Sequence, residues 1–324
     1  MPIAPIIPDH SSDGMRVLQS IGRSISLAHC ALFMSATDLA KLVFLSAIWG
    51  GSFIFLRIAV PETGPLLTAT LRTGLAGLAL LVFAHLTSVP MNWRSNLKPF
   101  AIVGLFAGVI PFSCFSFAAL FLPAAHSAVL NATAPLFGAV FSVIWLSERM
   151  TAQKLAGLLL GVIGVGILVG IGTVAMTPST LLAIAACLVS AASYALSSII
   201  VQKTGKPGGI HPIAMATGSL ALGGLMMLPS VPFSLPPAMP SGTALACIAA
   251  MSLLSSGLAQ ALFIPLIVKV GPTRAMCVSF LIPLFSMLWA FVFLHESVGL
   301  STLVGGVIVL IAMGLVLTTS RSHQ

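Results

Sequence analysis

The sequence contains very few charged residues. Only 6% of its 324 residues are Asp, Glu, Lys or Arg, whereas 58% are hydrophobic. Soluble domains carry roughly 25% charged residues, so this composition excludes a soluble globular fold and predicts an all-α polytopic membrane protein. The net charge of +8 comes from basic residues scattered in short loops, without a patch or interleaved aromatics. Nucleic acid is therefore not an expected partner.

Carboxylates are absent from the middle of every long apolar run. All six lie in tails or near the ends of runs: Asp9, Asp13, Asp38, Glu62, Glu148 and Glu296. A carrier that exchanges protons through a carboxylate inside the membrane is therefore disfavoured, as are a metal site and carboxylate catalysis. A proton route through His85, His126 or His211 stays open, although histidines near span ends more often lie at the interface. We expect neither a cofactor nor a metal ion.

Disulfide and metal-binding cysteine patterns are also lacking. The five cysteines include no CxxC pair, and four of them lie in apolar segments. They are interpreted as small core residues. No ATP-binding motif is present, so a pump driven by a nucleotide is not expected.

Ten apolar runs are long enough to cross a bilayer core of about 30 Å as helices. They cover approximately 40–60, 65–86, 98–120, 124–145, 154–171, 180–202, 210–228, 243–268, 273–294 and 300–319. With the N-terminus in the cytoplasm, twelve of the fourteen Lys and Arg residues fall on the inner side and none on the outer side. This distribution predicts ten transmembrane helices in the inner (plasma) membrane, with both termini cytoplasmic.

The stretch 134–169 recurs at 282–317, with an offset of 148 residues and no gap. The two copies are five spans apart, so the second enters the bilayer from the opposite face. We therefore predict two inverted five-helix repeats. The expected organisation is a disordered cytoplasmic tail, two repeats and a short cytoplasmic tail: 1–39, 40–171, 180–319 and 320–324.

Several motifs follow one another in a distinctive order and spacing. They are WGGSFIFLRIAV (49–60), TATLRTGLAGLALL (68–81), the PLF blocks followed by SER and HES, and GLAQALFIPLIVKVGPTRA (257–275). Over about 40–319 the chain resembles the EamA branch of the drug/metabolite transporter superfamily. The resemblance implies a ten-helix carrier that exports amino acids or related small metabolites from bacteria. It also implies a central cavity lined mainly by helices 1, 3, 4, 6, 8 and 9.

Two arginines lie inside predicted spans. A charge there costs at least about 2.5–3.5 kcal/mol on insertion scales, so it usually faces the bundle interior or a cavity. Arg72 is a candidate to bind a substrate carboxylate or another anion, or else it ties helices together through backbone carbonyls. Arg57 stands where the family frequently has lysine, and it either supplies similar positive potential, snorkels to the outer interface or pairs with Glu62. At an offset of 145, Gln202 occupies the matching position in the second repeat.

Other polar and amphipathic residues inside spans complete the candidate substrate site: Trp49, Ser52, Asn131, Tyr194, Ser198 and Gln260. Each either lines the cavity or bonds to a neighbouring helix. Four prolines inside spans are candidate kinks or gating hinges: Pro111, Pro135, Pro265 and Pro283. Pro135 and Pro283 are equivalent in the repeat, which predicts paired bends.

The remaining signals concern helix ends and packing. Glu148 and Glu296 precede the fifth and tenth spans, and we expect them to stabilise the positive ends of those helices. Glycines in the same two spans predict close helix contact and a candidate homodimer surface.

Together these features predict a secondary transporter that exports small polar metabolites, foremost amino acids or derivatives, by alternating access. Its partners are a small-molecule substrate and the lipid bilayer. One alternative is a membrane-embedded enzyme acting on lipid-linked substrates, for which only His295 and Glu296 approach a catalytic pair. Others are a carrier for sugars or other metabolites, and a channel or sensor.

Overall fold

The computed structural model shows a bundle of packed helices. It describes residues 35–146, 150–170, 175–204, 208–270, 278–296 and 299–319. Most of both predicted tails and Glu148 lie outside these ranges. Within the described residues, seven helical segments are long and apolar enough to cross a bilayer, and three shorter apolar helices bring the total to ten. The predicted all-α membrane fold is confirmed.

The described residues of the first repeat form seven α-helices and one π-helix. They are α3 (Ala36–Thr63), α4 (Pro65–Leu86), α5 (Trp93–Gly104), η1 (Leu105–Val109), α6 (Ile110–Ala118), α7 (Ala124–Asn131), α8 (Ala134–Leu146) and α9 (Ala152–Gly170). The described part of the second repeat comprises α10 (Pro178–Thr204), α11 (Pro212–Met227), the 3-10 helix η2 (Leu228–Phe233), α12 (Gly242–Ala250), the π-helix η3 (Met251–Leu258), α13 (Ala259–Val270), α15 (Val278–Leu294) and α16 (Leu300–Thr319).

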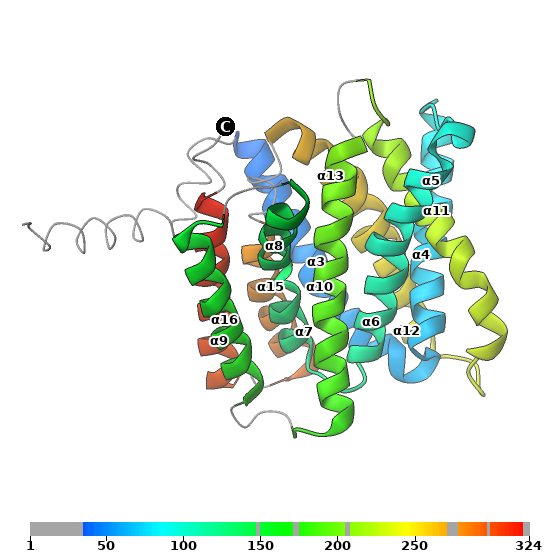
Figure 1. Cartoon of the computed structure of the whole chain (residues 1–324). Helices are drawn as coiled ribbons and strands as arrows, with labels where there is room; N and C mark the ends of the chain where they lie inside the picture. The colour runs from blue at the N-terminus through cyan, green and yellow to red at the C-terminus, as the bar shows by residue number, and fades with distance from the viewer. Residues whose placement is uncertain are drawn as a thin grey trace, which may run out of the picture.

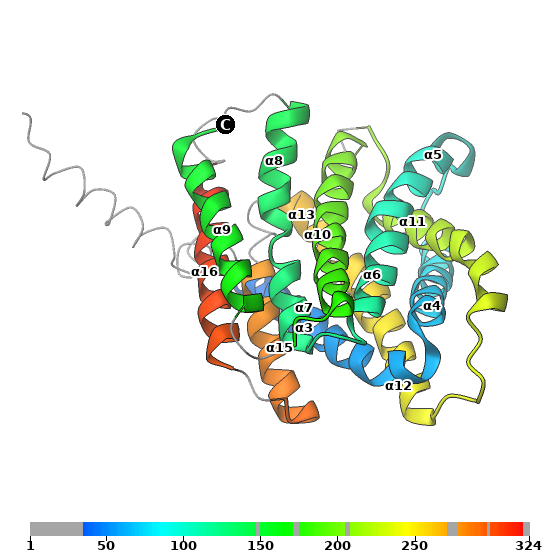
Figure 2. The ribbon, with the colours of Figure 1, turned by 60° about the horizontal axis from the view of Figure 1, so that its bottom comes forward.

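The first helices of the two repeats cross the bundle in opposite senses. In Figure 1, α3 begins at the end of the bundle where α16 finishes, whereas α10 begins at the opposite end. The view in Figure 2 gives the same order. We call these the Ser35 end and the Glu62 end, after residues that lie there. This arrangement agrees with the inverted duplication that the sequence predicts, and the last helices of the repeats, α9 and α16, pack against each other.

Two π-helical segments occupy equivalent places in the repeats. η1 begins at residue 105 and η3 at residue 251, an offset of 146 residues, and each interrupts the third span of its repeat. The sequence predicted continuous helices here. η3 packs against α4, and η1 packs against α11, the helix equivalent to α4. Because π segments occur frequently at functional sites, they direct attention to the space beside α4.

The four predicted kink residues have different surroundings. Pro111 follows η1 at the start of α6, and Pro135 is the second residue of α8, after a break at the end of α7. Proline fits the first turn of a helix because its missing N–H has no helical partner there. Pro265 and Pro283 instead lie inside α13 and α15. The equivalent positions 135 and 283 therefore mark a helix break in one repeat and an uninterrupted helix in the other.

Glycines allow α4 and α11 to approach closely. A Cβ atom built on Gly77 would lie 2.8 Å from the Cα of Ala221, and one built on Gly224 would lie 2.7 Å from the Cα of Gly74. Neither neighbour can move without a shift of the backbone. In lipid, where tails and side chains are equally apolar, such close packing is a main source of helix association. This contact fixes the position of α4, which carries Arg72.

Gly77→Ala should lower stability because the new methyl group would meet the backbone of α11. Overpacking of this kind costs about 1–3 kcal/mol. Gly74→Ala is the matched control, since a Cβ built on Gly74 meets nothing within 4 Å on the same helix. Thermal unfolding of the purified protein in detergent should give a lower melting temperature for Gly77→Ala alone. Equal melting temperatures for the two variants would contradict the packing argument.

Candidate functional site

Polar and aromatic groups gather at three levels along α3. Lys41 lies near the Ser35 end, Trp49 near the middle and Arg57 toward the Glu62 end. A helix rises about 1.5 Å per residue, which places Lys41 and Arg57 about 24 Å apart along the axis. The three levels therefore sample most of the thickness of a bilayer core.

A shallow recess lies between α3 and α13 at the Ser35 end. It is lined by Asp38, Lys41, Ala261, Leu262, Pro265 and Leu266. Of its charged lining residues, Asp38 is buried and Lys41 is exposed. Of the four predicted kink residues, Pro265 lines it.

Trp49 connects α3 to η3 beyond this recess. Its indole N–H donates to the carbonyl oxygen of Ser255 at 2.9 Å. Its ring meets the ring of Phe263 edge-on, with centroids 4.9 Å apart. Ser52 is buried, and its hydroxyl donates to the carbonyl of Trp49 at 2.7 Å, within the same helix. Trp49 and Phe263 thus join α3 to η3 and α13 near the middle of the bundle.

Arg72 is the buried cation at the centre. The residue is only 5% exposed, and its Nε donates to the hydroxyl of Ser256 in η3 at 3.0 Å. Its guanidinium carbon lies 4.0 Å from the ring centroid of Phe112. Among the described residues no Asp or Glu forms an ion pair with it. One hydroxyl and one aromatic face are weak partners for a buried charge, which leaves Arg72 able to bind an anion.

Tyr194 of α10 is the second predicted site residue that interacts with Arg72 of α4. The two side chains interact electrostatically, and the tyrosine ring stacks on Phe115 with centroids 6.3 Å apart. Phe115 in turn meets Phe53 of α3 edge-on at 5.4 Å. The first, third and sixth spans, through α3, α6 and α10, therefore contribute a continuous row of aromatic rings on one side of the cation.

The other predicted site residues are placed less tightly around Arg72. Asn131, at the end of α7, has a buried Oδ1 that accepts no hydrogen bond from the described residues. Gln260 is half-buried in α13, directly after η3. Ser198 is exposed, and its hydroxyl donates to the carbonyl of Tyr194 at 2.9 Å. The structure thus brings Arg72 and Trp49 together at η3, and Tyr194 interacts with Arg72 electrostatically.

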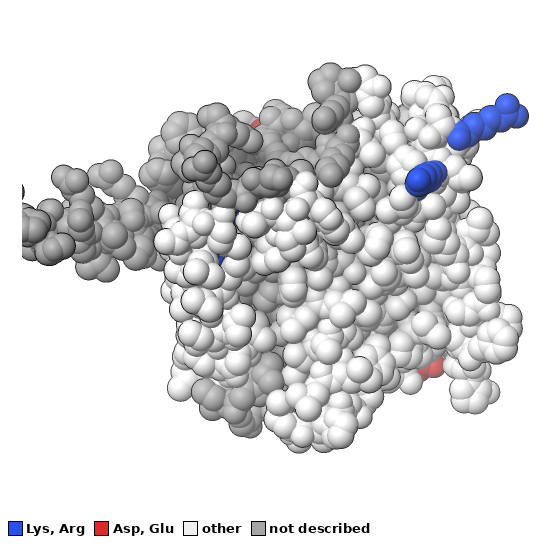
Figure 3. Space-filling model, viewed as in Figure 1, with Lys and Arg blue, Asp and Glu red and all other residues white. Residues whose placement is uncertain are grey.

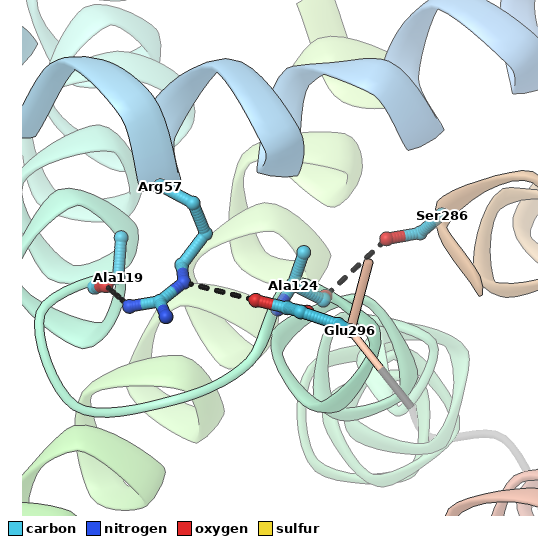
Figure 4. A network of polar contacts seen from close by, with 5 residues as sticks. All are labelled: Arg57, Ala119, Ala124, Ser286 and Glu296. Atoms are coloured by element: carbon cyan, nitrogen blue, oxygen red, sulfur yellow. Dashed lines mark hydrogen bonds and ion pairs between the residues drawn. The ribbon is translucent and has the colours of Figure 1, made fainter. Parts of the chain in front are cut away.

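Arg57 does not pair with Glu62, and that predicted alternative is wrong. Its Nε forms an ion pair with Glu296 Oε1 at 3.2 Å, and its Nη1 donates to the carbonyl of Ala119 at 2.7 Å (Figure 4). Glu62 instead accepts from the N–H of Ser241 at 2.6 Å and from its hydroxyl at 2.9 Å. Glu62 therefore stabilises the first turn of α12.

The structure also changes the predicted role of Glu296. Its second carboxylate oxygen accepts a hydrogen bond from the N–H of Ala124 at 3.2 Å (Figure 4). That N–H begins α7, so the described bond stabilises the positive end of the fourth span rather than the tenth. Glu148, the equivalent residue of the first repeat, lies outside the described residues.

Ser256 and Phe112 are the site residues that sequence reasoning missed. Ser255 and Ser256 form a polar pair inside an apolar run, and this pair was an available signal. Phe112 gave no such signal, because nothing in the sequence distinguishes it from the other phenylalanines in apolar runs. Among the described residues no group of three His, Cys, Asp or Glu side chains could hold a metal ion.

The outer surface shows which part of the bundle faces lipid. In the view of Figure 3, the wall of the described bundle is almost free of charge, and basic side chains stand at the rim of the Ser35 end. The described basic residues near that end include Lys41, Arg94 and Lys98. An apolar wall with charge confined to the rims is the surface of a protein that spans a bilayer.

A duplicated, inverted helical bundle with polar groups at its centre defines a multi-pass membrane transporter. The chain belongs to the EamA-like transporter family, whose model matches residues 39–170 and 181–318. The family is non-enzymatic, which excludes the alternative of a membrane-embedded enzyme.

Relatives from several bacteria support the same class. An uncharacterized transporter of Bacillus subtilis, YvbV, is 29% identical over 87% of this chain and 92% of its own. The protein PecM of Dickeya dadantii is 27% identical over 84% and 90%. The uncharacterized inner membrane transporter YedA of Escherichia coli is 27% identical over 76% and 79%. A crystal structure with 20% identity shares the fold, with a TM-score of 0.60 over 89% of this chain and 98% of the other.

The contact between Arg72 and Phe112 should appear as a coupling energy. We expect a double-mutant cycle of Arg72→Met and Phe112→Leu to give about 0.5–2 kcal/mol, as for a desolvated cation–π pair. Phe112→Tyr keeps the ring face and serves as the control. Thermal or denaturant unfolding in detergent measures each stability. Strict additivity of the two changes would show that the ring does not stabilise the guanidinium.

Proposed function

We propose that this transporter exports small metabolites that carry a carboxylate, foremost amino acids or their derivatives, by alternating access. The observation that carries the proposal is the burial of Arg72 without an acidic partner among the described residues. A substrate carboxylate at this position would gain two hydrogen bonds from the guanidinium in a geometry that carboxylates match well. A neutral sugar would leave the charge unbalanced.

The surroundings of Arg72 support a small amphipathic substrate. Phe112 and Tyr194 supply ring surface beside the guanidinium, while Ser256 supplies a hydroxyl. Pockets for small ligands combine apolar walls with a few polar groups that fix the orientation of the ligand. An amino acid side chain against the rings, with the carboxylate on Arg72, fits this arrangement.

The proposed orientation places the described recess on the cytoplasmic side. The Ser35 end carries the basic rim, which by the positive-inside rule faces the cytoplasm. The recess between α3 and α13 lies at the same end. A substrate would therefore enter from the cytoplasm, reach Arg72 near the midplane and leave at the Glu62 end. Rocking of the inverted repeats around that fixed position would alternate the access.

Arg72→Ala should reduce transport about 10- to 100-fold, because a hydrogen bond to a charged group contributes about 1.5–3 kcal/mol. The assay is counterflow of a panel of labelled amino acids and sugars into proteoliposomes without ATP. Arg72→Lys should recover part of the rate, since it keeps the charge but loses the planar donor pair.

Arg94→Ala is the matched control for the transport assay, because Arg94 is exposed near the Ser35 end. It should transport at the wild-type rate. Normal transport by a folded Arg72→Ala variant would overturn the proposed role of Arg72. Transport of neutral sugars with no response to Arg72 would favour the sugar carrier, and inertness toward the whole panel would remove the support for amino acids.

The proposed orientation predicts which loops a membrane-impermeant thiol reagent can reach in intact cells. In a variant without the five native cysteines, Met239→Cys at the Glu62 end should be labelled from outside. Ser95→Cys near the Ser35 end should be labelled only after the membrane is permeabilised. Both positions are exposed, so burial cannot explain a difference between them. The reverse pattern would contradict the orientation.

A further inference from the structure

An ion pair holds both ends of one connection at the Glu62 end. The clamp consists of Arg57 and Glu296 and the two backbone groups that they bind, the Ala119 carbonyl and the Ala124 N–H (Figure 4). Arg57 donates to Ala119 at 2.7 Å, and Glu296 accepts from Ala124 at 3.2 Å. These residues bracket the connection between α6 and α7. The connection therefore cannot move outward unless the clamp opens.

The clamp joins the two repeats. Arg57 and the α6–α7 connection belong to the first repeat, whereas Glu296 follows α15 in the second. Ser286 of α15 adds a second link, since its hydroxyl donates to the Ala124 carbonyl at 3.3 Å. Repeats that rock against each other must break contacts of this kind in each cycle.

The backbone around Glu296 is held in an unusual shape. His295 has a φ of 53°, in the left-handed region that non-glycine residues seldom adopt. This turn follows the last residue of α15, and the N–H of Glu296 donates to the carbonyl of Ala290 at 3.2 Å. Such conformations concentrate at functional and switch regions, where the surrounding contacts hold them in place. Here the turn brings the carboxylate to the start of α7.

The arginine of the clamp belongs to the first repeat. At the offset of 145 that aligns the first and sixth spans, Gln202 matches Arg57. Lys203 directly follows Gln202, so the second repeat carries a cation one position further along. The Arg57–Glu296 pair is the clamp that the described residues show.

We propose that the Arg57–Glu296 clamp is the lock on the Glu62 end of the transport path. The clamp is closed while the recess at the Ser35 end is accessible. The α6–α7 connection separates from the clamp before Arg72 becomes accessible from the Glu62 end. Removal of either charge shifts the population toward the state that is open at the Glu62 end. This inference rests on the proposed alternating access, although its test needs no substrate.

The test uses Phe53→Cys in the cysteine-free protein in intact cells. Phe53 is buried on α3, one turn from Arg57 and on the same helix face, so it lies directly behind the clamp. Labelling by an impermeant maleimide should be slow with the clamp intact. Glu296→Gln and Arg57→Gln should each raise the rate about fivefold or more, as expected when the population of a minor state increases.

Glu62→Gln is the matched control, because Glu62 is a carboxylate at the same end that binds Ser241 instead of a cation. It should leave the labelling of Phe53→Cys unchanged, and labelling of Met239→Cys should be fast in every background. Unchanged labelling in both Glu296→Gln and Arg57→Gln would overturn the lock. Equal acceleration by Glu62→Gln would also overturn it, since any lost carboxylate would then loosen this end.

A second measurement avoids the cysteine substitutions. Hydrogen–deuterium exchange of the otherwise native protein should be faster in peptides containing Ala124 when Glu296 is replaced by Gln. Exchange at the wild-type rate would contradict the clamp. The lock can fail in these tests while Arg72-dependent transport persists. Conversely, a carrier that transports none of the tested substrates but still shows clamp-dependent labelling would contradict the substrate proposal and support the lock.

Discussion

A guanidinium at the centre of an apolar bundle must be stabilised by groups that the bundle itself provides. Arg72 obtains one hydroxyl from Ser256 and one ring face from Phe112. Both depend on the place of α4, which the glycine contact with α11 sets, and on η3, which presents Ser256. A carboxylate from the protein would neutralise the site permanently. The absence of one among the described residues is the reason for proposing that Arg72 binds a substrate anion.

The bilayer explains why the fold was predictable and why its irregular parts were not. Spans of about 20 apolar residues, and basic residues on one side, follow from the thickness and polarity of the membrane. A π segment changes neither length nor hydropathy, so η1 and η3 left no trace in the composition. The break between α7 and α8 had a signal in Pro135, whose equivalent Pro283 nonetheless lies within an intact helix.

The candidate site likewise has residues that the sequence could predict and residues that it could not. Arg72, Trp49 and Tyr194 could be selected because polar and aromatic groups inside spans are rare and costly. Their partners could not, since these depend on how each helix is rotated about its axis. Arg57 and Glu62 are five residues apart, so on a helix they point roughly 140° away from each other. Arg57 instead meets Glu296, which a turn at His295 brings in from the other repeat.

The two ends of the carrier are related by duplication but differ in charge. Both copies keep a glutamate after the fourth span of the repeat, Glu148 and Glu296, while the arginine is present once. Such an asymmetry cannot drive net transport, because an ion pair alters only the relative populations of the two states. The gradient of the substrate or of a coupled ion must supply the direction. In the proposed mechanism, the lock at the Glu62 end decides where the carrier waits between cycles. In the proposed orientation, it waits open to the cytoplasm, where an exported substrate is produced.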